Sequence, residues 1–267
     1  MVPAGLTNAV AVAAGFWHSL ALRADGTVVA WGSNNAGQTN VPPGLSNVVA
    51  IASGAVFSLA LKADGTVALW GRYSSHPATN LPPGLTNVVA IAAGPVGNHS
   101  LALKADGTVI AWGEDDQFGE LDVPSGRSNV VAVAAGGVHN LALNGDASVI
   151  AWGGGKIVDR STGGDWGQSI VPASLTNTAA IGAGYIHSLA VAGDVSPFIT
   201  APLVDRTVLY GTTTWLRVGV AGSQPFTFQW KFDGTDLPGA TNAVLELDNV
   251  QLEDAGRYSI LASSRRT

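Results

Sequence analysis

The chain has 267 residues, of which 46% are hydrophobic and 12% are charged, and its formal net charge is −6. This length suits one large all-β domain or two smaller domains, and the apolar content is sufficient to fill a core. Lys and Arg are few and are not clustered, which argues against nucleic acid as a partner, and the absence of cysteine excludes disulfides, thiolate catalysis and cysteine-ligated metals.

The sequence carries no segment that predicts insertion into a membrane. No apolar run reaches the roughly eighteen residues that a membrane-spanning helix needs. Met1 is followed directly by Val-Pro-Ala-Gly, with neither a basic region nor an apolar signal core. We therefore expect no membrane span, and we expect any targeting segment to lie outside this sequence.

One segment recurs five times along the first part of the chain. Its copies begin at Leu6, Leu45, Leu85, Arg127 and Leu175. Each copy reads as a short Val/Ala strand, a second strand such as His-Ser-Leu-Ala-Leu, a turn, and a third strand that ends in Trp-Gly, followed by a variable polar stretch. A β repeat of about 40 residues is typical of a propeller blade.

The turns and the strands of these units support the same interpretation. Asp25-Gly26, Asp64-Gly65 and Asp106-Gly107 are pairs that allow a tight hairpin, since Gly accepts a positive φ. The strands are apolar with little alternation, which predicts that both faces of each sheet are covered by neighbouring sheets. Small residues end each first strand, as at 13–15 and 92–94, which places that strand near a central axis.

Residues 6 to about 194 resemble the regulator of chromosome condensation repeat family. The matching strings in the first unit are Gly15-Phe16-Trp17-His18-Ser19-Leu20, Asp25-Gly26-Thr27-Val28, Trp31-Gly32 and Asn34-Asn35-Ala36-Gly37-Gln38. The resemblance implies a β-propeller, usually of seven blades. Here four units carry Trp-Gly, at Trp31, Trp70, Trp112 and Trp152, and the fifth unit stops near residue 194.

The predicted fold is therefore all-β, with a partial or small β-propeller of four full blades plus a partial fifth in residues 1–195. We expect four-stranded sheets fanned about one axis. Three arrangements are open: a five-bladed ring completed by the segment after Asp194, two chains that complete each other's rings as a homodimer, or an open array with capped ends. A five-blade arc that is closed or nearly closed is the preferred expectation.

Four histidines recur at one position of the repeat, where the second unit has Phe57. They are His18, His99, His139 and His187. Because a phenyl ring cannot replace a catalytic imidazole, we interpret them as partly buried residues whose ring nitrogens tie a strand to a neighbouring loop. A metal ring is the alternative, but equivalent positions on separate blades are expected to lie too far apart. We expect no metal and no cofactor, and we interpret the repeated tryptophans as core between blades.

The composition changes near residue 195, and residues 196–267 form a second predicted domain. From residue 198 it resembles an immunoglobulin-like domain of the bacterial surface type, on Trp230 and on the corner formed by Asp254, Gly256 and Tyr258. The resemblance implies a β-sandwich in which Val218 and Ile260 replace the usual cysteine pair. We expect this domain to be truncated and the chain to be a fragment, or a short reading frame, of a longer modular protein.

The residues that the blades do not share point to a noncatalytic binding or adhesion module of an exported bacterial protein. Phe16, Trp17 and Tyr185 occupy equivalent turns of blades one and five, and in a closed ring they would form an apolar platform for a sugar ring or a protein. Trp166 lies in a Gly-rich insertion of the fourth unit and is a further candidate contact. The expected location is extracellular or at the cell surface.

A hydrolase of glycosidase or esterase type is the alternative function. Asp115 and Asp116 lie in an acidic stretch at 114–122, and His99 follows a longer turn than its counterparts. Carboxylates of this kind serve glycoside chemistry or bind calcium, but a solvated acidic loop is the favoured interpretation. No other enzyme motif is present, and the nucleotide-exchange activity known for part of the resembling family is not carried over, because no contact residues match.

Overall fold

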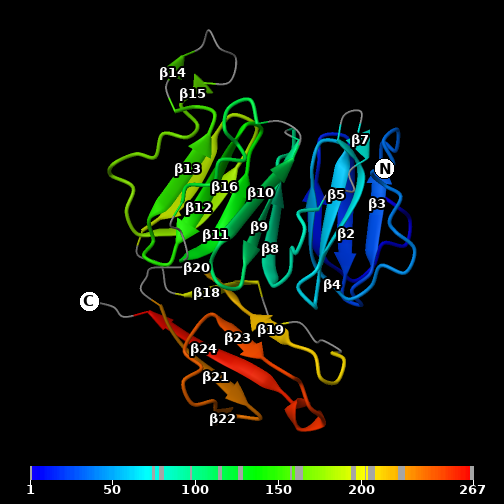
Figure 1. Cartoon of the computed structure of the whole chain (residues 1–267), viewed down its shortest axis with the longest axis vertical. Helices are drawn as coiled ribbons and strands as arrows, with labels where there is room; N and C mark the ends of the chain where they lie inside the picture. The colour runs from blue at the N-terminus through cyan, green and yellow to red at the C-terminus, as the bar shows by residue number, and fades with distance from the viewer. Residues whose placement is uncertain are drawn as a thin grey trace.

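The computed structural model describes residues 2–73, 76–77, 81–96, 98–113, 116–125, 129–156, 158–159, 165–193, 197–201, 203, 208–221 and 226–264. In this part of the chain the structure is all-β apart from one short 3-10 helix, Leu252–Asp254 (Figure 1). No helix of the described residues has the length and apolarity that crossing a membrane requires.

Each repeat forms one antiparallel sheet in which successive strands pair in order. Blade one consists of β1 (Ala9–Ala14), β2 (His18–Arg23) and β3 (Val28–Gly32), and blade two of β4 (Val48–Ser53), β5 (Phe57–Lys62), β6 (Val67–Tyr73) and β7 (His76–Pro77). Blade three consists of β8 (Val88–Ala93), β9 (His99–Lys104) and β10 (Val109–Gly113), blade four of β11 (Val130–Ala135), β12 (His139–Asn144) and β13 (Val149–Gly153), and blade five of β16 (Thr178–Ala183) and β17 (Ser188–Ala192).

Only blade two contains four strands, so the expectation of four-stranded sheets throughout is wrong for the described residues. In blade one the chain leaves the third strand at Gly32, whose φ of 111° breaks the extended backbone. The polar stretch that follows closes in short turns, with Gly37 N–H donating to the Asn34 carbonyl and Asn40 N–H to the Gly37 carbonyl. A stretch that folds into turns has no extended backbone to offer as a fourth strand.

The hairpin between the second and third strands has the expected turn chemistry. In blade one, Arg23 N–H donates to the Thr27 carbonyl and Gly26 N–H to the Arg23 carbonyl, so three residues form the loop. Gly26 takes a φ of 76°, while the Asp25 carboxylate accepts hydrogen bonds from the backbone N–H of Thr27 at 3.0 Å and from its hydroxyl at 2.6 Å. The turn is therefore a three-residue hairpin with a left-handed Gly.

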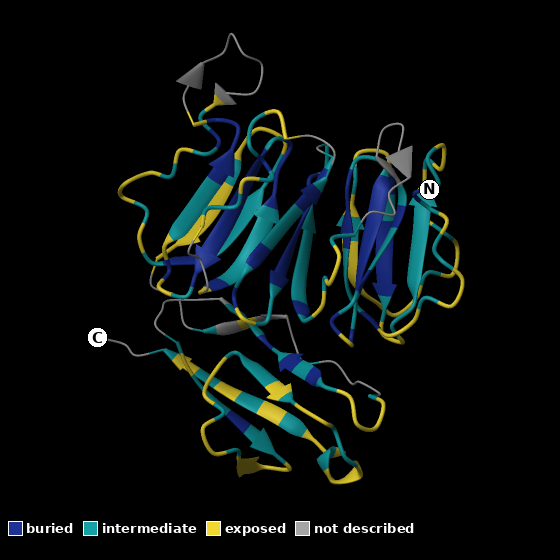
Figure 2. Cartoon of the chain, in the orientation of Figure 1, coloured by how far each residue is buried: buried dark blue, intermediate teal, exposed yellow. Residues whose placement is uncertain are grey.

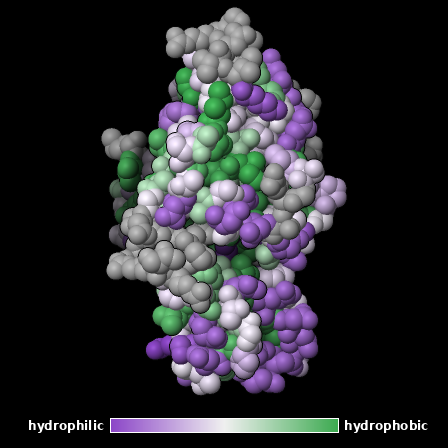
Figure 3. Space-filling view, turned by 90° about the vertical axis from the view of Figure 1, so that its left-hand side faces the viewer, coloured by the Kyte–Doolittle hydropathy of each residue, from purple (hydrophilic) through white to green (hydrophobic). Residues whose placement is uncertain are grey.

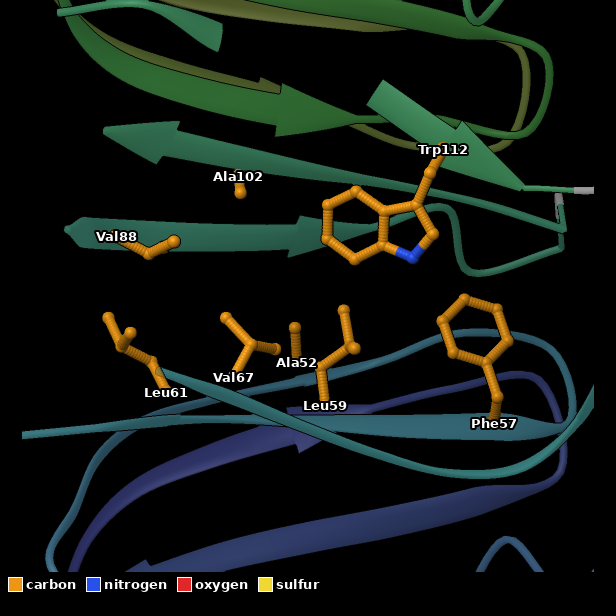
Figure 4. Close-up of a cluster of buried hydrophobic side chains, with 8 residues drawn as sticks. All are labelled: Ala52, Phe57, Leu59, Leu61, Val67, Val88, Ala102 and Trp112. Carbon is orange, nitrogen blue, oxygen red and sulfur yellow. The ribbon is translucent and has the colours of Figure 1, made fainter. Parts of the chain in front are cut away.

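The sheets stack face to face in chain order. The second strand of each blade contacts the first strand of the next, as in β2 with β4 and β12 with β16, and the first strands of successive blades also adjoin. At the second junction, Leu59 and Leu61 face Ala102 and Trp112 of blade three (Figure 4). The most deeply buried strands are consequently the middle strands of the inner blades (Figure 2).

The arc is open in the described structure. Blade one and blade five each leave apolar residues exposed on their outer faces, among them Val12, Leu189 and Val191. Strand β18 (Phe198–Ala201) pairs with β20 (Gly219–Ala221) and not with β17. The expectation of a closed or nearly closed ring completed by the segment after Asp194 is therefore not met, because the chain passes from blade five directly into the C-terminal unit.

The C-terminal unit contains small antiparallel sheets below the blades (Figure 1). Strand β19 (Thr214–Arg217) pairs with β23 (Val244–Leu247), and β21 (Phe226–Phe232) lies between β22 (Thr235–Asp236) and β24 (Tyr258–Ser264). Trp230 is fully buried, and the Tyr258 hydroxyl donates to the Asp254 carbonyl at 3.0 Å. These features are those expected of a tyrosine corner, and the immunoglobulin-like assignment stays a prediction.

In blades one, three and four, the glycine that follows the first strand lies against the backbone of the next blade. A Cβ at Gly94 would lie 2.5 Å from the Gly136 carbonyl oxygen and 3.0 Å from Cε1 of His99. We expect Gly94→Ala to lower the free energy of unfolding by about 2–3 kcal/mol, because a backbone carbonyl cannot move aside without shifting blade four. Urea denaturation of the full chain measures this change.

The matched control is Gly182→Ala in blade five, where nothing lies within 4 Å of the added Cβ. This variant should be as stable as the wild type, or more stable by about 0.5–1 kcal/mol, since Ala restricts the unfolded chain. If Gly94→Ala and Gly182→Ala were equally stable, the junction between blades three and four would tolerate a side chain at Gly94, contrary to the prediction.

Candidate functional site

The turn between the first and second strands of each blade forms one rim of the arc. In blade one this turn exposes Phe16 and Trp17 by 54% and 61%, and their rings meet edge to face with centroids 4.6 Å apart. Tyr185 and Ile186 are exposed at the same turn of blade five. The equivalent residues of the inner blades are smaller and partly or fully buried.

The structure does not bring the three predicted rim aromatics together. Phe16 and Trp17 lie on the first blade and Tyr185 on the last, because the arc is open. Tyr185 instead packs over Gly137 of blade four, whose N–H donates to the Tyr185 carbonyl at 3.0 Å. Within one chain, the aromatic residues therefore form two separate exposed groups.

Trp166 is presented by the insertion that precedes blade five. It belongs to β15 (Asp165–Trp166), which pairs with β14 (Val158–Asp159), and its side chain is exposed. Its backbone N–H donates to the side-chain oxygen of buried Gln168 at 2.8 Å. The equivalent bond joins the Ala36 N–H to Gln38 at 2.9 Å and the Phe118 N–H to Glu120 at 2.9 Å. The backbone at Trp166 therefore has the same conformation-fixing bond as the other units, and only the indole side chain is particular to this unit.

The acidic stretch does not form a catalytic carboxylate pair among the described residues. Asp115 lies outside the described residues. Asp116 accepts a hydrogen bond from the Leu121 N–H at 2.8 Å, and Glu120 is buried. The Asp116 and Glu120 carboxylates thus each accept a backbone hydrogen bond within the turn and stabilise it. No group of three or more His, Asp or Glu residues in the described chain could hold a metal ion.

His99, the third residue of the hydrolase alternative, also makes a structural contact. It is buried, and its Nε2 lies 2.8 Å from Oδ1 of Asn140 in blade four. An imidazole in this position cannot reach a substrate at the rim, so the structure gives the hydrolase alternative no support.

The other buried histidines make the same bond to the next blade. His18 Nε2 lies 2.9 Å from the Ser58 hydroxyl, and His139 Nε2 lies 3.0 Å from the Ser188 hydroxyl. Because Ser58 donates its own proton to the Gln38 carbonyl at 2.9 Å, the histidine must donate, and the proton resides on Nε2. These three rings are fully buried rather than partly buried, and they bind the middle strand of the next blade rather than a loop.

Trp70, Trp112 and Trp152 are buried between blades, as interpreted, whereas Trp31 on the first blade is only partly buried. Trp70 Nε1 donates to the Gln38 carbonyl at 3.0 Å, and Trp152 Nε1 donates to the Glu120 carbonyl at 3.0 Å. One linker carbonyl therefore accepts from two side chains of the following blade. Sequence reasoning missed this acceptor, although a Gln or Glu recurs 32 residues before each of these tryptophans.

The junction between blades two and three is the exception. Phe57 replaces the histidine there, and its ring faces Trp112 across the junction (Figure 4). Trp112 Nε1 has no hydrogen-bond partner among the described residues. The repeat thus tolerates an apolar ring at the histidine position, as expected of a structural residue.

A groove of about 1110 Å³ separates the blades from the C-terminal unit, at the narrow waist visible in Figure 3. Val89 and Val131 line it from the blades, and Trp215 and Arg217 from β19. Arg217 donates from Nη2 to the Val131 carbonyl, and burial lowers its pKa to about 10. Arg217 remains charged at neutral pH and links the two units.

Comparison with known proteins agrees with this architecture. The model of the regulator of chromosome condensation (RCC1) repeat matches residues 9–38 and 88–120. The structure is similar to that of Prp20p from Saccharomyces cerevisiae, with 22% identity, a TM-score of 0.56, and 73% of this chain and 57% of that chain covered. Yeast RCC1 (Prp20) bound to Kap60 gives 23% identity, a TM-score of 0.55, and coverage of 73% and 56%.

This chain therefore spans somewhat more than half of the solved structures that it resembles. No curated protein matches its sequence. The repeat match, the stacked sheets and the structural likeness together support a propeller built from RCC1-type repeats. At these identities the likeness concerns the fold alone.

The buried histidines make stability depend on pH. Burial lowers the pKa of His139 from 6.5 to about 4, with smaller contributions from His99 and His187, and burial also lowers the pKa of His18. Between pH 6.5 and 4 the unfolded chain binds more protons than the folded chain, so stability falls as the pH is lowered through this window. For His139 alone the loss is about 3 kcal/mol.

Urea unfolding at pH 7 and pH 4 measures this loss. His139→Phe, which copies the residue of blade two, should lose less stability than the wild type over the same interval. Above pH 7 the two proteins should show the same flat pH dependence. Equal losses in the two proteins between pH 7 and pH 4 would contradict the assignment of a buried neutral imidazole.

Proposed function

We propose that this chain is a noncatalytic binding module, and that the exposed turn of Phe16 and Trp17 is its principal contact surface. The observation that carries this proposal is the edge-to-face aromatic pair, which stays exposed although every inner blade has smaller residues at that turn. Exposed aromatic groups of this kind are typical of surfaces that bind a ligand.

The backbone supports a preformed surface. Gly15 N–H donates to the His18 carbonyl at 2.9 Å, and Ser33 N–H donates to the Trp17 carbonyl at 2.9 Å. The turn is held by these bonds whatever side chains it carries, so little ordering entropy is lost on binding. Tyr185 and Trp166 offer further exposed contacts.

The ligand class that fits is a protein side chain or the apolar face of a sugar ring. In support of a protein ligand, Prp20p has binding properties to Gsp1p and histones; this chain covers only part of that protein, and its partners are not transferred. In support of a glycan, stacked sugars bind aromatic platforms. As part of the same proposal, we place the module at the outer surface of a bacterium, on the resemblance of residues 196–267 to bacterial surface domains, with a second copy completing the arc.

A glycan array and an array of purified proteins, each probed with the full chain, test this function. For a ligand found there, Phe16→Ala and Trp17→Ala should each weaken binding by about tenfold, because each removes an aromatic contact worth on the order of 1.4 kcal/mol. Tyr210→Ala is the matched control, since Tyr210 is an exposed aromatic of the C-terminal unit. Its affinity should equal that of the wild type.

Two results would contradict the proposal. Unchanged binding by both rim variants would place the contact elsewhere. Turnover in a panel of esterase and glycosidase substrates, abolished by Asp116→Asn, would show a catalytic protein.

A further inference from the structure

We infer that the two ends of the arc are the two halves of one more blade junction, and that a second copy of this chain docks on them head to tail. The head face is the outer face of blade one and contains Val12, Ser19 and Trp31. The tail face is the outer face of blade five and contains His187, Leu189 and Val191.

The tail face carries the apolar residues that every inner blade buries. Leu189 is 64% exposed and Val191 is 54% exposed. Their counterparts in blades one to four are at most 4% exposed, and these are Leu20, Leu22, Leu59, Leu61, Leu101, Leu103, Leu141 and Leu143. The leucines of blades one to three pack in clusters with residues of the next blade, and β12, which carries Leu141 and Leu143, contacts β16 of blade five. The tail face is therefore a junction that lacks its next blade.

The head face carries the complementary set. Val12 is 75% exposed, whereas its counterparts Ile51, Ile91 and Val133 pack against the preceding blade. Trp31 is only partly buried, although Trp70, Trp112 and Trp152 are buried. Blade one therefore presents the side of a junction that normally receives the leucines.

The polar groups at the two faces are complementary as well. His187 is exposed, and the side chains of Ser19 and Trp31 make no hydrogen bond within the described part of the chain. At the inner junctions a histidine of one blade binds Ser58, Asn140 or Ser188 of the next blade. By the same register, His187 of one copy pairs with Ser19 of a second copy.

A second copy is the occupant because nothing in the described part of the chain covers the tail face. After Ala192 the chain enters the C-terminal unit, and Leu189 and Val191 stay exposed with that unit in place. The head face of the same chain lies at the other end of the arc. The head face of another copy has the residue types that cover the leucines at the inner junctions. Figure 3 shows apolar residues gathered above the waist on the side that Figure 1 has at its left.

Docking of the tail face on the head face would also bring Tyr185 of one copy next to Phe16 and Trp17 of the other. At the junction of blades four and five, Gly137 N–H donates to the Tyr185 carbonyl. The equivalent pair between copies is Tyr185 with Phe16, so the turn of one copy adjoins the aromatic pair of the next. The docking specifies the second copy that the proposed function includes, and this consequence for the aromatics rests on the proposed binding function. Association of two copies is measured without any ligand, so a failed docking and a failed binding function are distinguishable.

A head-to-tail contact joins different faces, so blocking either face alone leaves the other intact. Val12→Glu blocks the head, and Leu189→Glu blocks the tail. Sedimentation velocity of the full chains gives their mass over a range of concentrations. We expect the wild type to associate as its concentration rises, each variant alone to stay monomeric, and an equimolar mixture to form a one-to-one heterodimer and nothing larger.

The matched control is Val10→Glu, an exposed valine of the same strand whose inner counterparts Val49, Val89 and Val131 line the groove toward the C-terminal unit. This variant should associate like the wild type. His187→Ala should weaken association by about threefold to tenfold, the value of one hydrogen bond. Circular dichroism and thermal unfolding confirm that each variant is folded.

Three outcomes would overturn the inference. A wild type that is monomeric at all concentrations shows that the faces do not meet. Self-association of either single variant shows a symmetric contact. A mixture of the two variants without heterodimer shows that the head and tail do not fit.

Discussion

The structure depends on a linker carbonyl that accepts side-chain hydrogen bonds at three of the four blade junctions, as seen in the described residues. The Gln38 carbonyl, for example, accepts hydrogen bonds from Ser58 and from Trp70, both of the following blade. The histidine of the preceding blade, His18, donates to the same Ser58. At other junctions asparagine takes the place of the serine, or the tryptophan is absent. Buried polar groups must be paired, so the loss of one member leaves the others without partners. This constraint explains why histidine, serine or asparagine, and tryptophan recur together. The glycine recurs for a steric reason, because an added Cβ would meet the backbone of the next blade or the ring at the histidine position.

The same constraint explains what the ends of the arc are. An inner blade has a neighbour on each face, and the following blade covers its leucines, but the first and last blades each have one neighbour. Exposed apolar area costs about 25 cal/mol per Å² relative to burial, so these faces favour any contact that covers them. Phe57 shows the limit of the rule, because at its junction apolar packing against Trp112 replaces the polar pair.

Much of this arrangement was predictable from the sequence. Short stretches of sequence are enough to predict the period of the repeat, the Asp-Gly turns and the tryptophans as core between blades. Whether the blades close into a ring could not be predicted in this way. The angle between successive blades is set by packing between residues about 40 positions apart, and no short stretch of sequence determines it. The partner of His99 could not be predicted for the same reason, since Asn140 belongs to another unit. The rim aromatics were found as exposed residues, but their separation follows from the open arc.

The position of the variable residues follows from where the backbone bonds lie. At the rim, the hydrogen bonds that close each turn join backbone groups, as between Gly15 and His18 or Gly54 and Phe57, and they do not depend on the side chains between them. A substitution at Phe16 or Trp17 therefore leaves the junction intact, whereas a substitution one residue earlier, at Gly15, forces a Cβ into the Gly54 carbonyl of the next blade. Adjacent residues are thus under separate constraints: the glycine allows the blades to approach each other, and the side chains of the turn that follows it can vary without breaking the junction.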